Sequence, residues 1–199
     1  MRVLVACEYS GTVRDAFRAL GHDAVSCDLL ETDRPGPHIV GNVLDVLGDG
    51  WDLMVAHPPC TDLATSGNAH MAAKMADGRV DAGLGFVRAL MNAPIPRIAV
   101  ENPRSIISSR IRPADQLIHP WQFGHGEQKA TCLWLKNLPA LVPTNIVPGR
   151  EQRLYNLSPS PERWKLRSAT FPGIAAAMAA QWGTRELALQ LDIFDALAL

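Results

Sequence analysis

The stretch Trp51-Asp-Leu-Met-Val-Ala-His-Pro-Pro-Cys60-Thr-Asp62 places an apolar run directly before two prolines and a cysteine. The run from Leu53 to Ala56 is bounded by turn residues, which is typical of a buried parallel strand. Pro58 and Pro59 have no backbone N–H to donate, so the strand must end before them. Cys60 is therefore predicted at the carboxyl end of a strand, where open α/β sheets bind their ligands. A small buried cysteine without a chemical role would give the same local pattern.

Upstream of this strand, the sequence has the pattern of a β-α-β unit. Residues 2–7 are apolar and predict a strand, and residues 12–20 predict an amphipathic helix. Residues 23–27 predict a second strand, which is closed by Asp28. An acidic residue at the tip of the second strand is typical of nucleotide sites. Gly11 stands alone, without a G-x-G-x-x-G motif, and is a weak phosphate-binding signal.

Downstream of Cys60, short apolar runs continue to alternate with amphipathic stretches. Further strands are predicted at 38–41, 98–100 and 131–135, and helices at 80–91, 171–182 and 185–198. Residues 61–78 are predicted to form a mobile loop or a loop with a short helix, and residues 137–170 a short irregular excursion. This order predicts one α/β domain over residues 1–199, with a mostly parallel sheet and helices on both faces.

The composition is that of a soluble globular protein, with 47% hydrophobic and 20% charged residues and a net charge of −1. No apolar run approaches the roughly 18 residues that span a bilayer, and the amino terminus turns acidic too soon for a signal peptide. We therefore predict a cytoplasmic protein without a membrane partner. The four cysteines lack zinc-site spacing and predict reduced thiols and no metal. Leu63 stands where a zinc deaminase would need its second cysteine, which excludes that class.

Three predicted strand ends, at residues 8–11, 45–60 and 101–103, are expected above one edge of the sheet. Their motifs resemble, in the same order, those of the DNA cytosine-5 methyltransferases, in a small form of the phage or prophage kind. Tyr9-Ser10-Gly11 is similar to the Phe-Ser-Gly of the first motif, and Pro58-Pro59-Cys60 matches the Pro-Pro-Cys of the nucleophile loop. Glu101-Asn102-Pro103 resembles the Glu-Asn-Val motif, and Phe171-Pro172-Gly173 resembles the closing motif.

This resemblance implies a Rossmann-like class I methyltransferase fold and transfer of a methyl group from S-adenosylmethionine to carbon 5 of cytosine in DNA. Carbon 5 becomes nucleophilic when a thiolate adds to carbon 6, which is the role implied for Cys60. Glu101 would hydrogen-bond the ring N3, and Asn102 would brace the Glu101 turn. The residues implied to hold the cofactor are Tyr9, Ser10, Gly11, Asp28, Asp45 and Pro58, with the two aspartates on ribose and adenine.

The chain departs from the family pattern at three places. Val13-Arg14 stands where the first motif usually continues with two glycines, which predicts a less open cofactor loop. The family's Arg-x-Arg motif is represented by Lys129, which would replace the first arginine in the catalytic site, whereas Thr131 cannot replace the second. Residues 137–170 are too short for the usual target-recognition domain, so a homodimer or a partner subunit would have to supply strict target reading.

The charges are unevenly distributed between the two halves of the chain, with −4 over residues 1–100 and +3 over residues 101–199. A basic stretch with interleaved aromatic residues is typical of a segment that contacts nucleic-acid phosphates. The side chains predicted to bind DNA are Arg150, Arg153, Arg163, Trp164, Lys165 and Arg167. Two alternatives remain open: a thiol-dependent modifier of free pyrimidine nucleotides, and an inactive relative that binds cofactor or DNA.

Overall fold

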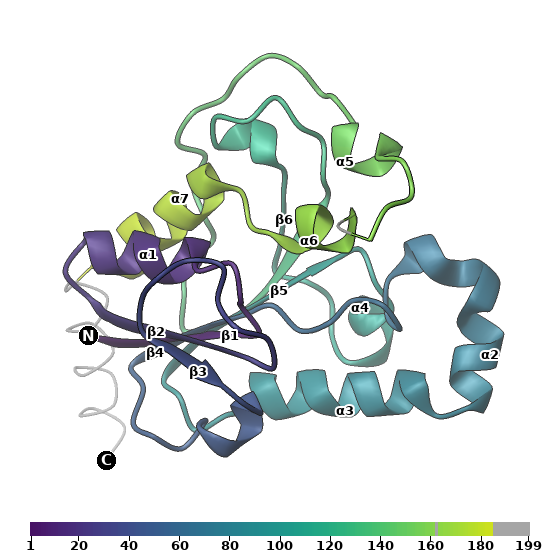
Figure 1. The fold of residues 1–199 in the computed structure, drawn as a ribbon, viewed down its shortest axis with the longest axis horizontal. Coiled ribbons are helices and arrows are strands. Elements are labelled where there is room, and N and C mark those ends of the chain that lie inside the picture. The colour runs from purple at the N-terminus through teal and green to yellow at the C-terminus, as the bar shows by residue number, and fades with distance from the viewer. Residues whose placement is uncertain (162, 185–199) are drawn as a thin grey trace.

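The computed structural model describes residues 1–161 and 163–184, and its centre is a seven-stranded sheet (Figure 1). The strand order is β3-β2-β1-β4-β5-β7-β6. The strands are β1 (Arg2–Ala6), β2 (Asp23–Asp28), β3 (His38–Val40), β4 (Leu53–Ala56), β5 (Arg97–Pro103), β6 (Gln116–Ile118) and β7 (Thr131–Lys136). The first five strands pair in parallel, and β7 runs antiparallel to both of its neighbours. The predicted α/β class with a mostly parallel sheet is confirmed.

Helices cover both faces of this sheet, as predicted. The main ones are α1 (Thr12–Ala19), α3 (Arg79–Met91) and α7 (Pro172–Trp182). In β1, Val3 and Val5 belong to the core beneath α1 and α7, while Leu4 and Ala6 belong to the core above α3. All four side chains are fully buried because successive residues of a strand point to opposite faces and both faces are covered.

Shorter elements complete the described chain. They are η1 (Val43–Asp45), η2 (Thr65–His70), α2 (Met71–Ala76), α4 (Ile107–Arg110), η3 (Pro120–Gln122), α5 (Arg153–Asn156) and α6 (Arg163–Ser168). The stretch after Cys60 thus contains helical turns, and the excursion 137–170 contains α5 and α6. The predicted helix 185–198 lies outside the described residues. Within the described part of the chain, no helix has the length and apolar character needed to cross a membrane.

The structure differs from the sequence prediction at the far end of the sheet. Strand β5 does not end before Glu101 but continues to Pro103, because β7 pairs with it along that length and brings Leu133 opposite Glu101. Strand β6 was not predicted. It is only three residues long and pairs with β7 alone, so it has neither the length nor the alternation that marks a strand in sequence.

Candidate active site

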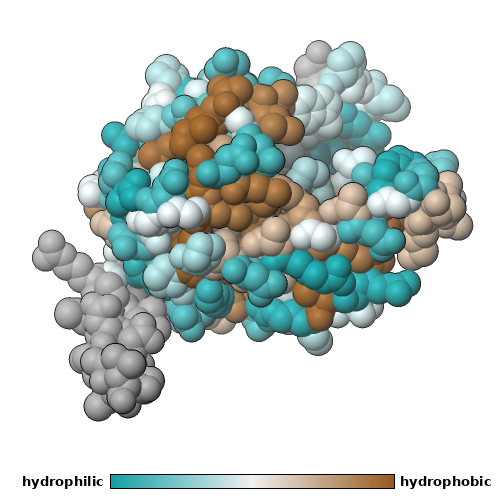
Figure 2. All heavy atoms as spheres, turned by 90° about the horizontal axis from the view of Figure 1, so that it is seen from below, coloured by the Kyte–Doolittle hydropathy of each residue, from teal (hydrophilic) through white to brown (hydrophobic). Residues whose placement is uncertain are grey.

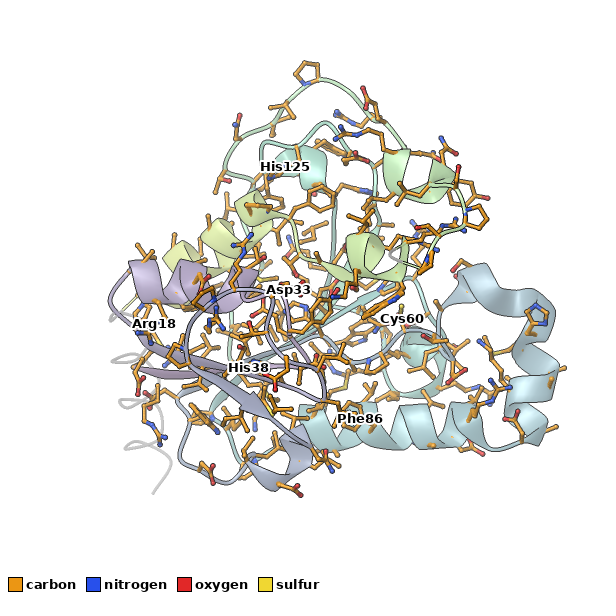
Figure 3. The ribbon with its side chains drawn as sticks, viewed as in Figure 1. Arg18, Asp33, His38, Cys60, Phe86 and His125 are labelled. Carbon is orange, nitrogen blue, oxygen red and sulfur yellow. The ribbon has the colours of Figure 1, made fainter. Side chains whose placement is uncertain are left out.

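Cys60 lies in a tight turn beyond the carboxyl end of β4, beside α6 (Figure 3). Its carbonyl accepts hydrogen bonds from the backbone N–H groups of Leu63 and Ala64, at 3.1 and 2.9 Å. The buried Lys74 on α2 reaches back to this turn, where its ammonium donates to the carbonyl of Thr61 and lies 3.3 Å from the Asp62 carboxylate. The turn at Cys60 is therefore held by its own backbone hydrogen bonds and by Lys74, a residue that sequence analysis had not singled out.

The thiol of Cys60 differs from the other thiols in its surroundings. The residue is exposed, but nearby protein atoms desolvate its sulfur and raise the thiol pKa. The charge of Glu101 adds to this rise, whereas Lys129 and Arg167 lower the pKa. By contrast, burial together with nearby acidic groups raises the pKa of Cys7 to about 12 and that of Cys27 to about 11. Among these thiols, Cys60 alone is exposed and next to basic side chains, which suits a nucleophile.

Glu101 on β5 is paired with a residue that sequence analysis did not select. The Oε2 atom of Glu101 lies 3.1 Å from Nδ1 of His57, and their side chains are only 13% and 9% exposed. Burial raises the pKa of Glu101, but the hydrogen bond and charge of His57 and the charge of Lys129 outweigh it. The pKa of Glu101 therefore lies below its ordinary value.

Asn102 contacts the segment before Cys60 from the neighbouring strand. Its side-chain Nδ2 donates to the carbonyl of Pro58 at 2.9 Å, and the residue is 1% exposed. We had predicted that Asn102 braces the Glu101 turn, but Glu101 is already fixed within β5 by its pairing with β7. The bond therefore ties the Glu101 strand to the first proline before Cys60.

Lys129 connects the catalytic side chains to α6. Its Nζ donates to the backbone carbonyl of Arg167 at 2.8 Å, and its charge acts on both Cys60 and Glu101. The structure thus brings Lys129 close to Cys60 and Glu101, and Asn102, the fourth residue predicted for the catalytic site, contacts Pro58 in the same region.

The predicted cofactor turn lies between β1 and α1. Gly11 precedes α1 with a φ of +69°, and a Cβ at this position would overlap the guanidinium of Arg14. The buried carboxylate of Glu8 accepts hydrogen bonds from the backbone N–H groups of Val13 and Arg14, at 2.7 and 3.2 Å. Because Glu8 already occupies these donors, the N-terminus of α1 is not available to a phosphate group.

Arg14 fills the space beneath this turn, where the family motif would have glycine. Its side chain is fully buried, and the guanidinium donates to the hydroxyls of Ser26 and Thr32, both at 3.2 Å. It also donates to the backbone carbonyls of Arg34 and Pro35, at 3.1 and 3.3 Å. Arg14 therefore holds the loop that follows Asp28, a role that the sequence pattern did not reveal.

Asp28 and Asp45, the two predicted cofactor aspartates, both act on the buried thiol of Cys27. The charges of both raise the pKa of Cys27, after the larger effect of burial, which places both carboxylates near one buried thiol. Asp28 is paired with Val40 across β2 and β3. Four exposed hydrophobic side chains adjoin these acidic residues in the chain or across the sheet: Leu29, Leu30, Val40 and Leu44. Figure 2 shows a broad hydrophobic area on the face of the molecule seen from below.

The six side chains predicted to contact DNA have two kinds of environment. Arg150 stacks 3.7 Å above the ring of Trp121, and Arg153 forms ion pairs with Glu127 and Glu151. The other four belong to α6. Three of them line a surface cavity of about 300 Å³, together with Pro159 and Ser160: Arg163, Trp164 and Arg167.

Helix α6 also contacts the cofactor turn. The hydroxyl of Tyr9 lies 2.8 Å from that of Ser168, and its ring centroid is 5.6 Å from that of Trp164. Lys165 lies 3.3 Å from the carboxylate of Asp33, which belongs to the loop held by Arg14. The segment expected to bind DNA and the turn expected to bind the cofactor are therefore neighbours.

No family model and no curated protein matches the chain. Among solved structures, it is similar to a chain described as a DNA modification methyltransferase encoded within a prophage of E. coli. That match has 14% identity and a TM-score of 0.49, and it covers 79% of this chain and 55% of the other. A variant of DNMT2 from Spodoptera frugiperda is similar at 15% identity and a TM-score of 0.45, with 74% and 57% covered. The chain therefore spans a little over half the length of these structures.

The sheet itself bears out the predicted Rossmann-like methyltransferase fold. Strands β3, β2, β1, β4 and β5 are parallel in that order, and the antiparallel β7 is inserted between β5 and β6. The turn at Tyr9, Cys60 and Glu101 lie at the carboxyl ends of the parallel strands β1, β4 and β5, respectively. Folds of this kind bind ligands at that edge of the sheet.

Proposed function

We propose that this protein is an S-adenosylmethionine-dependent methyltransferase that modifies carbon 5 of cytosine in DNA through a covalent bond to Cys60. The observation that carries this proposal is the exposed thiol of Cys60 beside the buried carboxyl group of Glu101. A nucleophile next to a buried acid–base group, close to a cofactor turn at the carboxyl edge of a sheet, is suited to covalent catalysis on a ring.

The cofactor side of the site fits S-adenosylmethionine by the chemistry of its residues. Two carboxylates, Asp28 and Asp45, can accept hydrogen bonds from ribose hydroxyls and the adenine amino group, and the exposed apolar side chains beside them suit the adenine ring. Glu8 blocks the donors that a dinucleotide phosphate would use, which favours a ligand without phosphate. When bound, S-adenosylmethionine supplies an electrophilic methyl group on a sulfonium.

Each residue of the site has a separate role in the reaction of the pyrimidine ring. The thiolate of Cys60 adds to carbon 6, which makes carbon 5 a nucleophile. Glu101 faces the charge that develops at N3, and Asn102 keeps the nucleophile turn at a fixed distance from the Glu101 strand. The ammonium of Lys129 favours the ionised forms of both Cys60 and Glu101.

The α6 cavity is the proposed contact with the nucleotide. Arg163 and Arg167 offer two guanidinium groups to phosphate oxygens, and the half-exposed Trp164 offers a ring on which a base can stack. Arg167, which lines this cavity, also lowers the pKa of Cys60. Extrusion of the target base towards Cys60 would place the flanking phosphates beside α6.

The decisive test uses DNA that contains 5-fluorocytosine, which cannot lose the group at carbon 5 after methyl transfer. With S-adenosylmethionine, wild-type protein is expected to form a covalent adduct that survives denaturing electrophoresis, and Cys60→Ser is expected to form none. Cofactor affinity should stay within about tenfold in this variant, because the thiol acts on the base. Thr61→Ala, an exposed change in the same turn, is the control and should retain the adduct. An adduct with Cys60→Ser would reject the proposal.

One observation favours a second candidate, a modifier of free pyrimidine nucleotides. Arg150 and Arg153 are engaged in contacts within the protein, and the α6 cavity with its two arginines is large enough for a mononucleotide phosphate. Incubation with labelled S-adenosylmethionine and either DNA or dCMP, followed by nucleoside analysis, distinguishes the two. Label in dCMP but not in DNA would select this second function.

A further inference from the structure

His57 and Glu101 are brought together by the register of two parallel strands. Ala56 at the end of β4 lies opposite Val100 of β5, so the next residue of each strand continues the same register. The backbone N–H of His57 donates to the carbonyl of Ala6 at 2.9 Å, which fixes the histidine beside β1. Its Nδ1 then lies 3.1 Å from Oε2 of Glu101. The contact is thus built into the sheet.

One polar atom of this pair has no hydrogen-bond partner among residues 1–161 and 163–184: Nε2 of His57, which is buried. A purely structural histidine in a core would be expected to use both ring nitrogens. A buried polar atom left unsatisfied next to an exposed nucleophile is more typical of a functional site.

We propose that His57 is a positioning residue that forms one acid–base pair with Glu101, and that this pair holds the proton given to the pyrimidine N3. This inference rests on the proposed function and adds a residue to its mechanism. One hydrogen bond, 3.1 Å long, joins Nδ1 of His57 to Oε2 of Glu101. Glu101 faces the ring, and His57 acts through Glu101.

The His57–Glu101 pair gives its proton to N3 of the ring and later takes it back. As the sulfur of Cys60 bonds to carbon 6, the electrons of the C5–C6 double bond move to C4–C5, and those of C4–N3 move onto N3. N3 takes the proton of the pair, which leaves a neutral imidazole and a carboxylate that accepts the new N3–H. After carbon 5 has taken the methyl group, N3 gives its proton back to the pair. Loss of the carbon 5 proton then expels the thiolate.

The charges around the pair fit this role. Lys129, in the segment before β7, lowers the pKa of Glu101 and of Cys60, which lies in the turn after β4. Arg167 of α6 lowers the pKa of Cys60. The low pKa of Glu101 means that the carboxyl group alone would be ionised at neutral pH and could not donate to N3. In this proposal, the proton of the hydrogen bond between His57 and Glu101 is the one that N3 receives.

The test separates position from proton supply. His57→Asn keeps an N–H donor near the position of Nδ1 but cannot carry the proton, and His57→Ala removes both. With DNA as substrate, we expect kcat/KM to fall about 100-fold in His57→Asn, with cofactor affinity unchanged within about twofold. The exposed His70→Asn is the control and should behave as wild type.

A second measurement does not depend on activity. Carbon-13 NMR of labelled glutamate carboxyl groups, assigned with Glu101→Gln, should show Glu101 titrating below the ordinary range in wild type and higher in His57→Asn. Titration of Glu101 in the ordinary range in wild type would overturn the inference. Wild-type activity in His57→Asn would also overturn it, since position alone would then suffice. If wild type transfers no methyl group to any pyrimidine, the proposed function itself fails.

Discussion

Arg14→Met tests whether the buried guanidinium holds the loop on the cofactor side of the site. The change keeps a long apolar side chain inside the protein but removes every donor of the guanidinium. The lost hydrogen bonds are those to Asp15, Ser26, Thr32 and the carbonyls of Arg34 and Pro35. The loop that follows Asp28 would keep its contacts with Lys165 and with the carbonyl of Tyr9.

The magnitude follows from the number and exposure of these acceptors. Five hydrogen bonds at about 1 kcal/mol each set an upper value of about 5 kcal/mol for the loss of unfolding free energy. Asp15 is 37% exposed, and Arg34 and Pro35 are exposed, so water can replace part of the loss. We therefore expect about 2–4 kcal/mol. In a chain of this length, that corresponds to a fall in Tm of about 4–16 °C.

Urea unfolding and thermal unfolding measure this loss, and calorimetry with S-adenosylmethionine measures its effect on the site. Arg18→Met is the matched control, because Arg18 lies one turn further along α1 and is exposed (Figure 3). It should change the unfolding free energy by less than about 0.5 kcal/mol. Equal losses in the two variants, or a loss below about 1 kcal/mol for Arg14→Met, would refute the role of the guanidinium.

Three further predictions concern the catalytic edge. Asn102→Ala should lower turnover about 100-fold, because it frees the nucleophile turn, while cofactor affinity measured by calorimetry is retained. Alkylation of Cys60 by iodoacetamide, followed by peptide mass spectrometry, should be slower at pH 7 than for a free thiol and should rise about tenfold per pH unit, since its pKa is raised. A flat profile would contradict this assignment. Neutralising Arg163 and Arg167 together should reduce the slope of log affinity for DNA against log salt by about 2 and leave the sequence preference unchanged. The matched control is the double variant Arg18→Gln and Arg88→Gln, and an equal slope in both would contradict the assignment.

The central strands and main helices could be predicted because their signals are local. The apolar run before Pro58 predicts a buried strand, and the prolines that follow predict where it ends. The predicted helices 80–91 and 171–182 begin and end within one residue of the observed elements. The carboxyl-end motifs could also be placed together, because parallel strands share one edge. Asp28 and Asp45 accordingly lie near the same buried thiol.

The contacts that refine the site could not be predicted because they depend on pairing between distant residues. In the sequence, His57 is recognisable only as the residue before two prolines. The register of β4 and β5 places it against Glu101. Likewise, Arg14 falls on what appears in sequence as the polar face of α1. It is buried because the loop 29–37 folds over it. Helical periodicity in the sequence cannot predict such a contact.

The two regions of the chain that are expected to bind ligands touch each other. Here α6 carries the basic cavity and also contacts Tyr9 of the cofactor turn. Lys165 of α6 in addition pairs with Asp33, in the loop that Arg14 holds. A ligand that shifts α6 therefore changes contacts at both regions, and thermodynamic linkage makes that influence reciprocal. Under the proposed function, the excursion 137–170 would therefore contact both the cofactor region and the substrate.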